Sequence, residues 1–211
     1  MQNQSISNKE ITHASYEATA QEFSHNVAEL APTGSINQLL QLLPSKAKII
    51  DIGCGSGRDA TIFSEMGAKV VGIDFCSNLL DIAKQNSPLP KFELMDIEAM
   101  DFPDSSFDGA WSACSLGHIA KKNLPAVLKK INVLLKDNGI FYLALKKGSG
   151  ELLEQDMRYE GNIQKFWSYY EEEELKNILQ AAHFKILDFT VVEKNSSYQT
   201  HPAFRVFCQK I

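Results

Sequence analysis

Hydrophobic residues in this chain follow two spacings that alternate along the sequence. Short apolar runs rich in Ile, Val, Phe and Leu are typical of buried strands, and we predict strands near 48–52, 69–74, 92–95, 107–114, 140–145, 186–192 and 204–208. Between these runs the apolar residues stand three and four positions apart, as on one face of a helix. We therefore predict helices near 13–30, 35–43, 58–66, 77–86, 124–135 and 168–182. Strands that alternate with helices predict an α/β domain with a mainly parallel sheet.

The ends of the chain are predicted to add a cover and a closing hairpin. Residues 1 to about 10 are polar, so we expect them to be disordered ahead of the first helix. Residues 1–44 together are expected to form a helical cap on a single domain that spans 1–211. A polar loop at 195–197 is expected to join the last two strands into an antiparallel hairpin.

Residues 146–168 are the least regular part of the pattern. Gly, Asn and acidic residues are scattered there among Arg158, Tyr159, Phe166 and Trp167. A connection of this length is unusual inside a compact domain, which indicates a substrate-side insert with a binding or lid role. Surface packing of the aromatic residues is the alternative interpretation.

The stretch 48–74 carries the clearest chemical pattern. Gly53, Gly55 and Gly57 stand at alternate positions after the first apolar run, and Asp74 closes the second run. Glycine permits positive φ angles and lets a ligand approach the main chain without a Cβ in the way. Strand, glycine turn, helix and strand make up the first half of a nucleotide-binding βαβ unit. An acid at the end of the second strand is placed to accept both hydroxyls of a ribose.

The glycine spacing separates two classes of nucleotide-binding protein. The dinucleotide fingerprint GxGxxG would place its third glycine at Arg58. The chain instead reads Asp51-x-Gly53-x-Gly55-x-Gly57. An acid two residues before the first glycine would repel a pyrophosphate, whereas it tolerates the α-amino group of an amino acid. This spacing, with the acid that ends strand two, resembles motif I of the class I S-adenosylmethionine (SAM)-dependent methyltransferases, in particular small-molecule members of types 11 and 25.

The resemblance covers roughly residues 16–208 and implies a fold, a cofactor and a set of cofactor contacts. The implied fold is a Rossmann-like sheet of seven strands, six parallel and the last antiparallel, with helices on both faces. The implied cofactor is SAM, which is released as S-adenosylhomocysteine (SAH). By the same resemblance, the glycine loop holds the amino-acid part, the acid after strand two holds the ribose, and an acid–apolar pair after strand three holds the adenine. The implied cofactor-binding residues are Tyr16, Asp51, Gly53, Cys54, Gly55, Asp74, Phe75, Asp96, Ile97 and Cys114.

Some of these residues have structural alternatives. Asp96 could cap a turn, and Phe75 could serve packing alone. In relatives with the pattern YxxxAxxF, an aromatic residue at the position of Tyr16 closes over cofactor and substrate. His118 lies just beyond the fourth strand, where it could touch substrate, act as a general base or be an orienting, hydrogen-bonded residue. The candidate substrate contacts are Tyr16, His118, Arg158 and Trp167, and His118 is the candidate catalytic residue.

Composition disfavours several kinds of partner. A net charge of −5 and a pI near 5.6 argue against a large nucleic-acid surface, which needs clustered Lys and Arg. The four cysteines are not spaced as metal-binding pairs, so no metal site is predicted, and reduced thiols fit a cytoplasmic protein. The polar start lacks the pattern of a signal peptide, and no apolar run approaches the roughly 20 residues of a membrane span.

The sequence at the end of the fourth strand reduces the number of possible classes of methyl acceptor. It reads Ser112-Ala113-Cys114-Ser115, which lacks the Asn/Asp-Pro-Pro-aromatic motif of enzymes that methylate adenine or glutamine amino groups. The Pro-Cys nucleophile of cytosine-C5 enzymes is missing as well. We therefore expect methyl transfer to a small molecule by in-line displacement, with positioning and desolvation as the main catalytic effects. Methylation of a protein or tRNA partner, and SAM binding without catalysis, are the alternatives.

Overall fold

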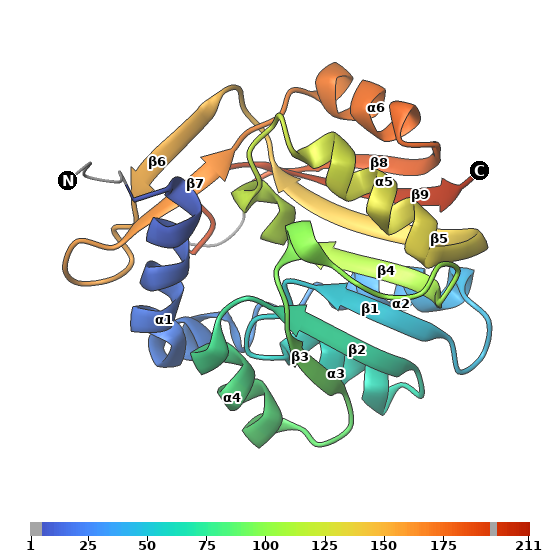
Figure 1. The fold of residues 1–211 in the computed structure, drawn as a ribbon, viewed down its shortest axis with the longest axis horizontal. Helices are drawn as coiled ribbons and strands as arrows, with labels where there is room; N and C mark the ends of the chain where they lie inside the picture. Colours follow the sequence, from blue (N-terminus) through green and yellow to red (C-terminus); the bar gives the residue numbers. More distant parts are fainter. Residues whose placement is uncertain (1–5, 195–197) are drawn as a thin grey trace.

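Seven strands form one sheet that helices cover on both faces, in a computed structural model that describes residues 6–194 and 198–211 (Figure 1). The order across the sheet is β3-β2-β1-β4-β5-β9-β8. These strands are β1 (Lys48–Ile52), β2 (Lys69–Asp74), β3 (Lys91–Leu94), β4 (Phe107–Ala113), β5 (Leu135–Lys146), β8 (Phe184–Val192) and β9 (Ala203–Lys210). The predicted α/β fold with a seven-stranded sheet is confirmed.

The sheet is parallel except at β9. This strand lies between β5 and β8 and pairs with both in the antiparallel sense, whereas the pairs from β3 to β5 are parallel. Six strands therefore share one direction and the last is reversed, as predicted. The parallel strands end at the same edge of the sheet, and it is there that open α/β sheets bind ligands.

The helices are divided between the two faces. They are α1 (Asn8–Val27), α2 (Thr33–Leu42), α3 (Arg58–Glu65), α4 (Ser77–Asn86), α5 (Leu124–Leu134) and α6 (Glu172–Ala181), with short 3-10 helices η1 (Ile97–Ala99) and η2 (Ser115–His118). Phe141, Leu143 and Leu145 of β5 pack in a core with α5 and α6. Tyr142 and Ala144 face the opposite way, into a core with α2 and α3. A strand buried on both faces reads as a continuous apolar run, as this segment does.

Helix α1 begins earlier than predicted. Ser7 and Glu10 form a capping box, in which Ser7 Oγ accepts the Glu10 N–H at 3.2 Å and Glu10 Oε2 accepts the Ser7 N–H at 2.8 Å. This box satisfies backbone donors at the helix start, so the expected disorder up to about residue 10 is wrong for residues 8–10. Ser7 is the N-cap of the helix, and the part of the prediction that falls on residues 1–5, like the predicted loop at 195–197, lies outside the described residues. No helix in the described part of the chain is long and apolar enough to cross a membrane.

The segment expected to be irregular contains a hairpin. Strands β6 (Glu151–Gln155) and β7 (Gln164–Ser168) pair in the antiparallel sense as a small second sheet. The side chains of α1 satisfy the outer edge of β7: Thr12 Oγ1 accepts the Phe166 N–H at 2.9 Å, and Ser15 Oγ donates to the Gln164 carbonyl at 2.6 Å. A two-stranded ribbon is marginal alone, so this docking against α1 stabilises it. The predicted irregularity of 146–168 was therefore wrong, because the contacts that order the segment come from far away in the sequence.

Candidate active site

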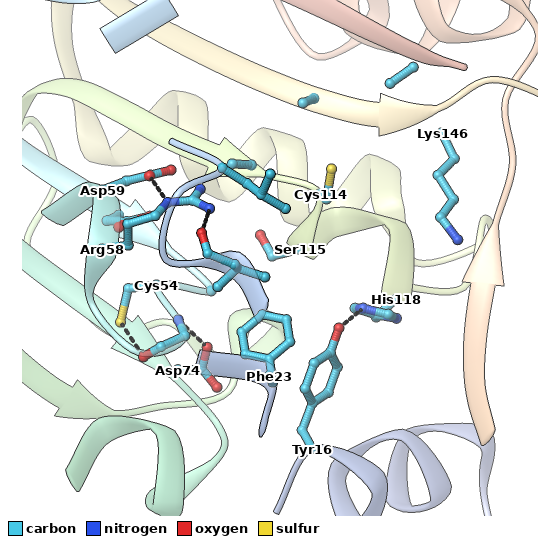
Figure 2. A pocket seen from close by; sticks show the side chains of 18 of the residues that line it. Tyr16, Phe23, Cys54, Arg58, Asp59, Asp74, Cys114, Ser115, His118 and Lys146 are labelled. Atoms are coloured by element: carbon cyan, nitrogen blue, oxygen red, sulfur yellow. Dashed lines mark hydrogen bonds and ion pairs between the residues drawn. The ribbon is translucent and has the colours of Figure 1, made fainter. Parts of the chain in front are cut away.

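The parallel strands end at a cavity of about 500 Å³ that also contacts α1 and the β6–β7 segment (Figure 2). Every residue that the sequence assigned to a cofactor or substrate lines this cavity. These residues are Tyr16, Asp51, Gly53, Cys54, Gly55, Asp74, Phe75, Asp96, Ile97, Cys114, His118, Arg158 and Trp167. The fold thus gathers positions from most of the chain into one space, and their contacts show what each can do.

The glycine loop lies in close contact with its surroundings. Gly53, Gly55 and Gly57 have φ angles of 75°, 55° and 80°, in the region that favours glycine. The N–H groups of Gly53 and Cys54 both donate to the carbonyl of Ile73, at 2.8 and 2.9 Å, which ties the loop to β2. A Cβ on Gly53 would stand 2.2 Å from the Cβ of the serine at the start of η2, so the loop could not hold this position with a side chain there.

Asp74 is a buried carboxylate at the end of β2. Its Oδ2 accepts the N–H of Gly55 at 2.8 Å, and its Oδ1 accepts the N–H of Cys76 at 2.9 Å. Burial raises the pKa of Asp74, although these backbone hydrogen bonds oppose the change. Each carboxylate oxygen can accept more than one hydrogen bond, so Asp74 retains capacity for donors that a ligand brings into the cavity.

Asp51 is an acid with an unused acceptor. It is 3% exposed, and its Oδ2 has no hydrogen-bond partner within the described ranges. Burial, followed by the neighbouring Asp59, raises the pKa of Asp51. Asp59 itself is held by Arg58 Nε at 2.7 Å and by Trp111 Nε1 at 3.0 Å. A buried acceptor without a partner fits a ligand that carries a positively charged donor, such as an ammonium group.

Asp96 has partners within the chain. Its Oδ1 accepts the N–H of Glu98 at 3.0 Å, which caps η1. Its other oxygen pairs with the ammonium of Lys9, which also contacts Glu98 at 2.8 Å. Burial lowers the pKa of Lys9, but the hydrogen bonds to both acids outweigh this and raise it. Asp96 therefore performs the turn-capping role that was weighed as an alternative, and a ligand amino group reaching it would share the carboxylate with Lys9.

His118 is held on both sides of its ring. Because a carbonyl can only accept, Nδ1 donates to the carbonyl of Phe166, at 2.7 Å, and Nε2 is left as an acceptor for the hydroxyl of Tyr16, at 2.9 Å (Figure 2). Burial, followed by the nearby cations Lys165 and Lys146, lowers the pKa of His118 to about 3. The structure thus orients a neutral histidine whose accepting nitrogen faces Tyr16 at the cavity.

Cations and aromatic rings cluster near the β6–β7 hairpin. The Trp167 ring lies 4.0 Å from that of His118, centroid to centroid, and Lys146 Nζ lies 3.4 Å from the Trp167 centroid. Arg158 forms two 2.7 Å hydrogen bonds to Asp156, which also pairs with the fully buried Lys165 at 3.0 Å. Burial alone would raise the pKa of Asp156, but these two cations hold it at about 2. Arg158 is therefore anchored by an acid, and Lys146 mainly by a ring.

The sequence analysis did not identify several further lining residues, among them Phe23, Asp59, Lys146 and Arg205. Phe23 is the last residue of the YxxxAxxF pattern, and a Cβ on Gly55 would lie 3.3 Å from its ring. The signal for Lys146 was its place at the carboxyl end of a predicted strand. Arg205 carried no local signal, because only the pairing of β9 with β5 brings it to the cavity.

Comparisons with known proteins agree on a family. Residues 50–143 match the family model described as a methyltransferase domain. Phosphoethanolamine N-methyltransferase of Plasmodium falciparum is 30% identical over 164 residues, covering 74% of this chain and 58% of that protein. A malonyl-[acyl-carrier protein] O-methyltransferase of Erwinia pyrifoliae is 28% identical over 144 residues, covering 67% of this chain and 54% of that protein. The chain spans little more than half the length of these two curated relatives.

Solved structures resemble the chain along nearly its whole length. 1,6-Didemethyltoxoflavin-N1-methyltransferase of Burkholderia thailandensis, solved with 1,6-didemethyltoxoflavin and SAH, gives a TM-score of 0.76 at 21% identity, covering 100% of this chain and 93% of that one. Magnesium protoporphyrin IX methyltransferase of Synechocystis, solved with SAM, gives 0.75 at 15% identity, covering 99% and 100%. At these identities the likeness establishes the fold.

Proposed function

The chain belongs to the class I SAM-dependent methyltransferases, and from this membership we propose that it transfers the methyl group of SAM to a small-molecule acceptor. The observation that carries the proposal is the acidic side of the cavity. Asp51 and Asp74 lie near a glycine loop whose backbone is open to a ligand. A cofactor with an ammonium group and a ribose brings the donors that these acids lack.

The residues on this side fit SAM part by part. The unpaired Oδ2 of Asp51 would accept from the ammonium of its methionine part, beside Gly53 and Gly55. Asp74 would accept from the ribose hydroxyls, in addition to its two backbone donors. Asp96 and Ile97 would bind the adenine, with Phe75 and Cys114 as further wall residues. Cys54 would contribute its backbone, because its side chain is buried.

Bound SAM supplies a methyl group that the positively charged sulfonium makes electrophilic. The lone pair of the acceptor forms the new bond to the methyl carbon, and the electrons of the broken carbon–sulfur bond remain on sulfur in SAH. The chain contributes alignment and the exclusion of water, in which Tyr16 and Phe23 of α1 cover the cavity. His118 Nε2 would accept a hydrogen bond from the acceptor and orient it, once the Tyr16 hydroxyl releases this nitrogen, whereas a pKa of about 3 makes it a weak proton acceptor.

Several observations favour a small acceptor over the other two candidates. The cavity has about 500 Å³, within the range for small-molecule sites, and α1 and the β6–β7 segment contribute to its lining. The relatives named above include enzymes described by small substrates, such as phosphoethanolamine and 1,6-didemethyltoxoflavin. We further propose a cytoplasmic location, which the four free cysteines support.

Calorimetry with SAM and SAH tests the cofactor assignment. We expect both to bind, and Asp74→Ala to weaken binding by about 1–3 kcal/mol, the loss for a charged hydrogen-bond acceptor. Asp81→Ala, which removes an exposed acid on α4, is the matched control. Thermal unfolding of each variant checks that the fold persists. Absence of SAM binding by the wild-type protein would refute the function, and an unchanged affinity of Asp74→Ala would refute the ribose contact.

Labelled SAM tests the reaction. We expect the protein to transfer label to a component of a metabolite extract, and not to RNA or protein from the same cells. Label in the macromolecular fraction alone would favour the protein or tRNA alternative. SAM binding without any labelled product would favour the non-catalytic alternative.

A further inference from the structure

Charge is divided between the two sides of the cavity. The acids that line it stand at the carboxyl ends of β1, β2 and β3 or at the start of α3, and they are Asp51, Asp59, Asp74 and Asp96. The cations Lys146, Arg158 and Arg205 line the side formed by β5, β9 and the β6–β7 hairpin, whereas the lining cations Lys9 and Arg58 pair with Asp96 and Asp59 on the acidic side. Figure 2 shows the Lys146 side chain extending from β5 toward His118, on the side of the cavity away from Asp74. A cavity divided in this way attracts ligands of opposite charge to its two sides.

Lys146 is a sheltered ammonium that forms no side-chain hydrogen bond with the residues the structure describes. Its side chain is 12% exposed, and its nearest acid is Glu154, at 4.0 Å, beyond hydrogen-bond distance. Its Nζ lies 3.4 Å from the centroid of the Trp167 ring. The ring attracts the positive charge, but it offers no conventional hydrogen-bond acceptor for the three N–H groups. Burial lowers the pKa of Lys146 to about 8, so the side chain is still mainly protonated at neutral pH.

Arg205 adds a second cation on the same face of the sheet. Opposite residues of an antiparallel pair share a face, and Arg205 pairs with Ala144 while Lys146 pairs with Ala203. Since Ala144 and Lys146 are two positions apart, Lys146 and Arg205 project to the same side. Among the described residues no carboxylate forms an ion pair with Arg205. Two neighbouring cations with so little compensating charge favour an anion between them.

The hairpin contributes a further surplus of positive charge. Arg158 and Lys165 share the single carboxylate of Asp156. These two cations and one acid carry one net positive charge, and Lys165 Nζ lies 4.2 Å from the centroid of the Tyr16 ring, which in turn contacts the His118 ring. The same region therefore offers cations for an anionic group and aromatic faces for an apolar body.

We propose that the methyl acceptor carries a carboxylate or phosphate group, bound by Lys146 and assisted by Arg205, with its apolar part against Trp167. This inference rests on the proposed function, since it assigns the β5–β9 side of the cavity to the acceptor of that reaction. The anionic group then anchors the acceptor away from the acids, and its nucleophilic atom faces the methyl group. Specificity for the acceptor arises from charge on this side, independently of cofactor binding.

Fractionation by charge tests the acceptor directly. A cell metabolite extract is separated on a strong anion exchanger, and the retained and unretained fractions are each incubated with the protein and labelled SAM. We expect labelled product from the retained fraction, and label from the unretained fraction alone would overturn the proposal. Phosphatase treatment of the retained fraction distinguishes the two sources of charge, because it abolishes labelling of a phosphate and spares a carboxylate.

Binding to the SAH-loaded protein tests the residues. The probes are benzoate, phenyl phosphate and uncharged benzamide, measured by calorimetry. We expect at least one anionic probe to bind tenfold or more tightly than benzamide, and Lys146→Met to lose roughly tenfold in anion affinity while SAH affinity stays unchanged. Lys147→Met makes the same substitution at the adjacent, exposed lysine and should leave both affinities as they are. Arg205→Gln should weaken the anion by a smaller factor.

Failure of the proposed function and failure of the anionic-acceptor proposal would give different results. If SAH fails to bind the wild-type protein, the proposed function is refuted. If SAH binds but neither anion binds better than benzamide, including the case in which no probe binds up to its solubility limit, the anionic acceptor alone is refuted. Equal effects of Lys146→Met and Lys147→Met would also overturn it, because the sheltered lysine would then have no particular role.

Discussion

The two sides of the cavity are built by different means. On the side of Asp74, the lining acids fall within residues 51–96, and backbone N–H groups of Gly55 and Cys76 hold Asp74 itself. On the side of His118, the residues come from α1, η2, β5, β7 and β9, and side chains hold one another. The hydrogen bond from Tyr16 to His118 joins positions that are 102 residues apart. One side is a local arrangement of backbone and acids, and the other is a product of tertiary packing.

This difference determines how each side should fail. On the glycine-loop side, the backbone packs so closely against η2 that it has no space for an added methyl group. Close packing therefore limits which substitutions this side tolerates. On the hairpin side, the buried cations share few acids. Removing one of these acids leaves a buried charge without a partner, so the stability of this side depends on charge compensation. Three predictions test this comparison, in order of decreasing effect.

The largest loss of stability is expected when the buried ion pairs of the hairpin are disrupted. Asp156→Asn should lower the free energy of unfolding by about 3–5 kcal/mol, because it leaves the fully buried Lys165 and the half-buried Arg158 without their acid. Urea unfolding measures the change. Asp137→Asn, at an exposed position, is the control and should change stability by less than about 0.5 kcal/mol. A loss below about 1 kcal/mol for Asp156→Asn would contradict the role given to charge.

A smaller loss of stability is expected from a substitution in the glycine loop. Gly53→Ala should cost about 2–3 kcal/mol of stability and also weaken SAH binding, because its φ is 75° and its Cβ would meet the serine of η2 at 2.2 Å. Gly67→Ala is the control: its φ of 93° causes strain, but no atom apart from its chain neighbours would lie within 4 Å of its Cβ. We expect roughly 1 kcal/mol there, with SAH affinity retained. Equal losses at both glycines would show that backbone strain alone, and not close packing, limits this side.

The third prediction concerns the pH dependence of stability on the side of His118. His118 has a folded pKa of about 3, below the ordinary value of 6.5, so between these values the unfolded chain binds a proton that the folded chain excludes. Its contribution to stability is present above pH 6.5 and is lost as pH falls toward 3. Between pH 6.5 and 5 this loss amounts to about 2 kcal/mol.

Urea unfolding at both pH values measures the effect in the wild type and in His118→Gln. The variant cannot titrate at this position, so its stability should fall by about 2 kcal/mol less over the same interval. The ring nitrogen resonances of His118 should also stay constant from pH 8 to 5. A titration of His118 within that range would mean that the ring is more accessible to water than its two hydrogen bonds indicate.

Much of the fold could be predicted from the sequence, because apolar spacing reports local geometry. Alternation of strand and helix spacing predicted the sheet and the helices on both faces, and the reversed last strand followed from the family resemblance. Two errors have different causes. The early start of α1 has a local cause, the capping box of Ser7 and Glu10, which lies within the polar stretch expected to be disordered. The β6–β7 hairpin had no comparable signal, since Thr12 and Ser15 of α1 satisfy the edge of β7 from about 150 positions away.

The site divides in the same way. Asp51, the glycines and Asp74 were identified from spacing alone, because a turn that exposes backbone to a ligand is encoded within a few residues. The sequence also identified His118, Arg158 and Trp167 as candidates, although without their partners. Only the tertiary structure fixed the tautomer of His118, the neighbours of Lys146 and the presence of Arg205 at the cavity. Contacts of this kind depend on how distant elements pack, and packing leaves no periodic trace in the chain.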